Sequence, residues 1–172
     1  MRPRQILSRL RDRKGQALIE FLFILPLVLL LILNLVNFGG FFYAWITVIN
    51  AAREGANYAI LGTPSAGAPN TPSGTQIVNL ITSEMASLPN SGSVSVNACS
   101  KFGTAVTPIT GTCSLSSFAS SDPESAYFII TSVKVTYTYV PFIQGFTFPN
   151  LGVYLTIPPT TVSSTALMRS YQ

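Results

Sequence analysis

One apolar run dominates what this chain can fold into. Between Ala17 and Ile49 the only side chain that is charged at neutral pH is Glu20, and Leu, Ile, Val and Phe make up most of the rest. A membrane span needs about 20 such residues, so the run is long enough to cross a bilayer and to extend beyond it. A secretory signal has an apolar region of only about 7–15 residues before its cleavage site. We therefore predict a single-pass membrane anchor.

The positive charge of the chain is concentrated before this run. Six of the ten basic residues lie within the first 15 positions: Arg2, Arg4, Arg9, Arg11, Arg13 and Lys14. Such clusters remain cytoplasmic, so we predict a cytoplasmic N-terminus, an inner-membrane anchor and an extracytoplasmic C-terminal domain. The rest of the chain contains the four other bases and five of the six acids. Nucleic-acid binding is therefore not expected, because it needs a basic face on the folded domain.

The apolar run continues into an amphipathic helix. Apolar residues recur at helical spacing in its second half, at Trp45, Val48, Ile49, Ala52, Ala56, Ala59 and Ile60. Gly62 and Pro64 then supply a stop signal. A helix over Ala17–Leu61 would be about 68 Å long, more than twice the roughly 30 Å hydrocarbon thickness. We expect its first half in lipid, its second half against a sheet, and a kink at Pro26, because proline removes one backbone hydrogen bond.

The rest of the chain has the pattern of a small α+β domain. A linker rich in Pro, Gly and Ser is predicted over 62–75, followed by a short amphipathic helix over Gln76–Leu88. Alternating residues over Ile129–Val140 give the strongest strand signal. Weaker strand signals lie at Ser93–Ala98, Val153–Ile157 and Thr161–Tyr171. We predict a long N-terminal transmembrane helix that continues into an exported domain over 76–172, with one short helix and a three- to four-stranded antiparallel sheet.

The inventory of reactive side chains is small. Cys99 and Cys113 lie close in the sequence, and an exported domain permits oxidation, so we favour a disulfide over two free thiols. The chain has no histidine, which removes Ser-His-Asp and Cys-His arrangements and leaves a zinc site without its usual ligands. P-loop, GxGxxG and GxSxG motifs are also missing from the sequence. We therefore expect no enzyme, no metal and no cofactor.

Glu20 is the exception within the apolar run. A carboxylate near the bilayer is costly and commonly functional. The simpler interpretation is that Glu20 lies in the first turns of the helix and offsets the positive end of the helix dipole. Gly15 stands five positions before it, directly after the basic residues. This arrangement favours the functional interpretation.

The order of basic leader, Gly15 and Glu20 resembles the processing site of type IV prepilins, in which a membrane peptidase cuts after a glycine. More closely, GQALIEFLFILPLVLLL followed by AAREGANYA resembles the TadE-like pseudopilins of tight-adherence (Flp) pilus systems. The C-terminal stretches VKVTYTYVPF and STALMRSY resemble the final strands of that family. Asn57 departs from the pattern, because a basic residue is expected there.

The resemblance implies a pilin-like fold and roles for particular residues. Residues 1–15 would be a leader that a prepilin peptidase removes by cutting between Gly15 and Gln16, and 16–61 would be the anchor helix. Glu20 would pair with the new α-amine of Gln16, in its own chain or in a neighbour. The implied partners are the prepilin peptidase, other pilins or pseudopilins, the pilus assembly platform and membrane lipid, in a homo- or hetero-oligomer.

Two functions of different classes follow. The first is a pseudopilin or minor pilin that acts in the assembly of a tight-adherence pilus and reaches the pilus or cell surface. The alternative is an uncleaved, membrane-anchored binding or adhesion module. Its partner would contact four aromatic residues that are otherwise ordinary core: Phe142, Phe146, Phe148 and Tyr154. The native N-terminus distinguishes the two functions.

Overall fold

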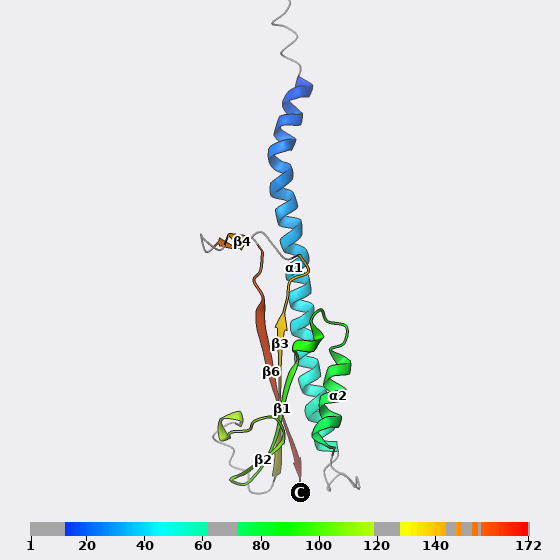
Figure 1. Ribbon diagram of the computed structural model, residues 1–172, viewed down its shortest axis with the longest axis vertical. Coiled ribbons are helices and arrows are strands. Elements are labelled where there is room, and N and C mark those ends of the chain that lie inside the picture. Colours follow the sequence, from blue (N-terminus) through cyan, green and yellow to red (C-terminus); the bar gives the residue numbers. More distant parts are fainter. Residues whose placement is uncertain are drawn as a thin grey trace, which may run out of the picture.

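One long helix, α1 (Arg13–Leu61), forms the axis of the molecule, and a sheet packs beside its C-terminal half (Figure 1). The computed structural model describes residues 13–61, 72–118, 128–143, 147–148, 153–154 and 156–171. A short helix, α2 (Gly74–Glu84), follows α1. The four-stranded sheet is antiparallel, with the order β2-β1-β3-β6. The predicted α+β fold class, with its long apolar helix and short second helix, is confirmed.

The sheet is built around β3 (Phe128–Tyr139), which pairs with β1 (Ser95–Phe102) on one side and with β6 (Thr160–Tyr171) on the other. The edge strand β2 (Ala105–Thr110) pairs with β1. Two-residue strands β4 (Thr147–Phe148) and β5 (Val153–Tyr154) pair separately. The elements η3 (Ser91–Ser93) and η4 (Leu115–Ser117) are short 3₁₀ helices.

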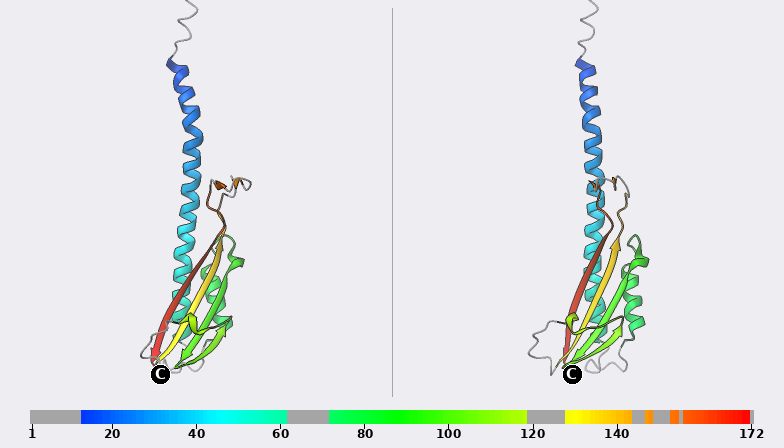
Figure 2. Two further views of the ribbon diagram at one scale, coloured as in Figure 1. Left: turned by 90° about the vertical axis from the view of Figure 1, so that its left-hand side faces the viewer. Right: turned by 60° about the vertical axis from the view of Figure 1, so that its left-hand side comes forward.

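Both helices cover the same face of the sheet, α1 over β3 and β6 and α2 over β1 and β2 (Figure 2). The face that they cover carries alternate residues of β3, which is the period-2 pattern of a half-buried strand. These residues are buried: Val133, Val135, Tyr137 and Tyr139. The opposite face holds a smaller cluster of Cys99, Phe118 and Ile130.

Alanines let α1 approach the sheet closely. Its buried apolar side chains are Ala44, Val48, Ala51, Ala52, Ala56 and Ala59. Gly55 lies in the same contact, because a Cβ added there would lie only 2.6 Å from Ile81 Cδ1 of α2. The prediction that Trp45 belongs to this buried stripe was wrong, since 46% of its surface is exposed. Ala44, one position earlier, occupies the buried site because it fits where the large indole does not.

Helix α1 begins at Arg13, two residues before Gly15. The sequence placed the helix after Gly15, but glycine within a helix costs only about 1 kcal/mol relative to alanine. The helical pattern beyond it therefore extends back through Gly15. The leader residues 1–12 and the linker residues 62–71 lie outside the described part of the chain.

Helix α2 begins with a capping box. The Ser73 side chain accepts a hydrogen bond from the Gln76 amide, and the Ser73 amide donates to Gln76 Oε1 at 2.8 Å. This reciprocal pairing satisfies two backbone donors that a helix start leaves open. The buried stripe of α2 and the turn after it consists of Ile77, Ile81, Met85 and Leu88. The capping box therefore sets where α2 begins, ahead of the residues that α2 buries.

Candidate membrane anchor and processing site

The first half of α1 is apolar and uncovered. None of its residues from 15 to 36 is buried, and the large apolar side chains there, apart from the half-buried Leu33, are exposed by 40% or more, with Phe23 at 75%. The 20 residues from Ala17 to Val36 extend about 30 Å along a helix, which equals the hydrocarbon thickness of a bilayer. By length and composition, this helix could span a membrane.

Gln16 and Glu20 lie together at the exposed start of α1. Gln16 Nε2 donates a hydrogen bond to Glu20 Oε1 at 3.2 Å. The carboxylate therefore already lies beside the residue that would carry a new α-amine after cleavage. Gly15 is also unobstructed, because a Cβ built on it meets no atom within 4 Å. The structure thus brings together the predicted processing residues on one accessible helix end.

Pro26 lies inside α1, and the helix continues through it. Proline has no amide hydrogen, so the carbonyl of Leu22 lacks its usual helical donor. The kink expected at Pro26 stays a prediction.

A buried asparagine joins α1 to the end of the sheet. Asn37 is fully buried, its Nδ2 donates to the Ile143 carbonyl at 3.2 Å, and its Oδ1 accepts from the Ile143 amide at 3.1 Å. Its own carbonyl accepts a hydrogen bond of 2.9 Å from Tyr139 Oη. Sequence reasoning missed this residue. We name these three hydrogen bonds the Asn37 clamp.

The clamp brings Phe142 against α1. The Phe142 ring lies over Gly40, and a Cβ on Gly40 would also lie 2.9 Å from Tyr139 Oη. Gly40 therefore allows Phe142 of the same chain to pack against α1. Of the four aromatic residues in the alternative function, Phe142 is 59% exposed. Phe146 lies outside the described residues, as do the side chains of Phe148 and Tyr154.

Cys99 and Cys113 form a disulfide, with their Cα atoms 5.8 Å apart. The predicted pairing is confirmed. It ties β1 to the segment after β2 and packs beside Phe118 and Ile130. Closing a loop of this length stabilises a domain by about 3 kcal/mol in the chain-entropy account. The disulfide is therefore a structural element of the sheet's outer face.

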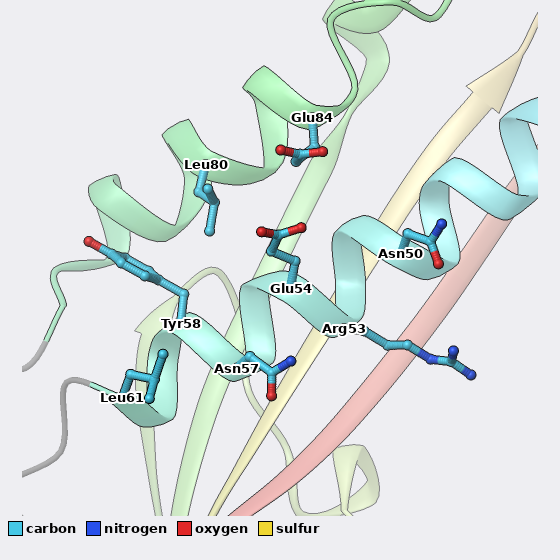
Figure 3. Close-up of a pocket in the computed structure, with 8 residues that line it drawn as sticks. All are labelled: Asn50, Arg53, Glu54, Asn57, Tyr58, Leu61, Leu80 and Glu84. Carbon is cyan, nitrogen blue, oxygen red and sulfur yellow. The ribbon is translucent and has the colours of Figure 1, made fainter. Parts of the chain in front are cut away.

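A polar groove lies between α1 and α2 at the end of α1 (Figure 3). The carboxylates of Glu54 and Glu84 point toward one another across it, while Arg53 points away (Figure 3). All three side chains are exposed. Within the described residues, no group of three or more Cys, Asp or Glu side chains is placed to hold a metal ion.

Comparison with known families identifies the helix. Residues 15–57 match the family model described as TadE-like protein, a match that covers most of α1 and none of the sheet. Comparisons with curated proteins and with solved structures gave no match. The family match connects the chain with tight-adherence pilus systems. As the sequence predicted, residues 15–57 of α1 are similar to the TadE-like family.

Proposed function

We propose that this chain is a pseudopilin or minor pilin that acts in the assembly of a tight-adherence pilus and is processed by a prepilin peptidase. One observation carries the proposal: within the segment that matches the TadE-like family, Gly15 and Glu20 lie at the exposed end of a helix whose other end is the core of the domain. The chain acts through assembly and carries no catalytic role.

Cleavage changes the charge at this end of the helix. The leader holds six bases and one acid, Asp12, so cutting after Gly15 removes a strongly cationic segment and leaves one α-amine at Gln16. Glu20 then balances that amine. In an apolar environment a paired carboxylate and ammonium are far more stable than either alone. The hydrogen bond of 3.2 Å between Gln16 and Glu20 supports this pairing within one chain, and a neighbouring subunit offers the same partner.

The N-terminus of the protein from its native host tests processing. We expect the mature chain to begin at Gln16, measured by intact mass and N-terminal sequencing of membrane fractions. A second prepilin in the same cells serves as the control that the peptidase is active. Retention of residues 1–15 alongside a processed control would refute the proposal and favour the uncleaved binding module.

The role of the carboxylate is tested separately. Glu20→Gln keeps the shape of the side chain and its contact with Gln16 but removes the charge. We expect normal membrane insertion and cleavage with piliation reduced at least about tenfold, the cost of losing roughly 1.4 kcal/mol. Glu20→Asp, which keeps the charge, should retain part of the piliation. Normal piliation of the Gln variant would remove the proposed role of Glu20.

A further inference from the structure

Among the residues that the structure describes, the end of the domain nearest the exposed half of α1 carries no charged residue. On α1, no charged residue lies between Glu20 and Arg53, and in the second half of the sequence none lies between Lys134 and Arg169. Strand β3 runs toward the exposed half of α1, and β6 returns from it (Figure 1). Arg169 and Lys101 both pair with Ile130, near the opposite end of β3. Charge is therefore segregated along the long axis of the domain.

Aromatic side chains are exposed at this uncharged end. We name four of them the aromatic collar, and all are about half exposed or more: Phe38 (48%), Phe42 (58%), Tyr43 (53%) and Phe142 (59%). The first three come from α1, whereas Phe142 comes from the segment after β3. The Asn37 clamp holds that segment at a fixed position along α1. The collar therefore combines α1 with the sheet domain at one level.

The level of the collar coincides with a membrane surface. If the hydrocarbon layer contains Ala17–Val36, then Phe38 and Tyr43 lie about 3–10 Å beyond it, at 1.5 Å per residue. Headgroups occupy about 5–8 Å on each side of the hydrocarbon layer. Trp and Tyr are enriched at this depth, because their rings are amphipathic, and Phe enters the same boundary on the apolar face of interfacial helices. Charged groups, which would favour bulk water, are missing from the same level of the chain.

We propose that Phe142 and the adjoining end of the sheet domain contact the lipid headgroup layer, so that the domain rests on the membrane that α1 spans. This inference rests on the proposed function in that α1 is the membrane anchor. The occupant of the surface is lipid, because the collar is continuous with the exposed apolar half of α1 and offers no charge for an ion pair. Anchor and domain then form two contacts with one bilayer, joined by the Asn37 clamp.

Single-tryptophan variants measure the depth of each site. The chain has one tryptophan, Trp45, so Trp45→Phe supplies a background in which Phe23, Phe142 or Phe102 is changed to Trp. Phe102, 45% exposed at the end of β1 far from the collar, is the matched control. Each full-length variant is placed in phosphatidylcholine vesicles with bromine on the acyl chains or a nitroxide on the headgroups.

We expect the headgroup nitroxide to quench Phe142→Trp about threefold or more above Phe102→Trp, as for an interfacial ring. Acyl-chain bromine should quench Phe23→Trp most strongly. The unsubstituted chain provides a further probe, since Trp45 lies about 14 Å beyond Val36 along the helix and should be quenched less than Phe142→Trp. Benzoylphenylalanine at position 142, read by mass spectrometry of lipid adducts, gives a second readout that does not depend on fluorescence.

The outcomes separate the two proposals. If Phe23→Trp is not quenched by bromine, α1 is not in lipid, and both the anchor and the lipid contact fail. If Phe23→Trp is quenched while Phe142→Trp behaves like Phe102→Trp and the crosslinker gives no lipid adduct, only the lipid contact fails. Shielding of position 142 from aqueous iodide without lipid quenching would assign the surface to a protein partner and would also overturn the inference.

Discussion

Replacing Asn37 by leucine tests whether one buried amide holds the membrane-proximal end of the sheet to α1. Leucine has the same number and branching of side-chain heavy atoms as asparagine and suits the apolar helix, so the change removes hydrogen bonding and leaves helix propensity favourable. The two side-chain hydrogen bonds to Ile143 are lost, while the bond from Tyr139 Oη to the backbone carbonyl at position 37 remains possible.

The expected magnitude follows from the groups left without partners. In Asn37→Leu the amide and the carbonyl of Ile143, a half-buried residue, both lose their partner. An unpaired buried polar group costs about 1–3 kcal/mol. Partial access to water places each of these two groups near the lower end of that range. We expect the segment after β3 to be destabilised by about 2–3 kcal/mol relative to α1.

Hydrogen exchange of the Ile143 amide measures this change directly. The exchange rate should rise about 30- to 150-fold, since each 1.4 kcal/mol corresponds to a factor of ten. Amides in the middle of β3, such as that of Val133, should exchange at unchanged rates. Thr47→Val is the matched control, because Thr47 Oγ1 bonds only the Tyr43 carbonyl within the same helix, at 2.8 Å.

Two results would refute the reasoning. Equal exchange of Ile143 in Asn37→Leu and in the unsubstituted chain would mean that the clamp does not hold this segment. A uniform rise across β3 would mean that Asn37 stabilises the domain as a whole and does not fix one end of it.

Two further predictions concern the packed core. Gly55→Val should lower the free energy of unfolding by about 1–3 kcal/mol through overpacking, because its Cβ would lie 2.6 Å from Ile81 Cδ1. Gly39→Ala, whose Cβ meets no atom within 4 Å, should raise the free energy of unfolding by up to about 1 kcal/mol. Coincident denaturation midpoints of the two variants would contradict both expectations. Burial raises the pKa of Tyr137, with a smaller contribution from Tyr139, and burial also raises the pKa of Tyr139. The unfolded chain releases these protons near pH 10 while the folded chain retains them, so the free energy of unfolding should be level below pH 10 and fall above it. Tyr139→Phe should make that alkaline fall shallower in denaturant titrations, and an unchanged slope would contradict the assignment.

The sequence was most informative where one physical demand governs a long stretch. The apolar run predicted α1 because no water-soluble fold exposes that many large side chains, and alternation predicted β3 because one of its faces is buried. The disulfide followed from two nearby cysteines in a domain that the sequence predicts to be exported. The predicted strand over Ile129–Val140 differs from β3 by one residue at each end.

Two features were missed because the residues around them give no strong local signal. Strand β2, with Pro108 inside it, has no strong strand pattern, and its pairing with β1 makes it a strand at an edge where proline is tolerated. Asn37 looks like a tolerated polar residue in an apolar helix, because its partner Ile143 lies 106 positions later. No local pattern contains that information.

Under the proposed function, α1 lies partly in lipid and partly against the domain core, and this constrains how a subunit can leave the membrane. Most of the large apolar side chains from Leu18 to Val36 are exposed, and each costs about 1.5–3 kcal/mol when it is left in water. Extraction into water would therefore cost tens of kcal/mol, so the segment can leave lipid only when other apolar helices replace it. Glu20 faces the same condition, because its charge needs an amine wherever lipid surrounds it. Once the leader is cut, neighbouring apolar helices can replace lipid around this segment, and an α-amine can pair with Glu20. An uncut subunit would instead carry six basic residues into the same apolar bundle.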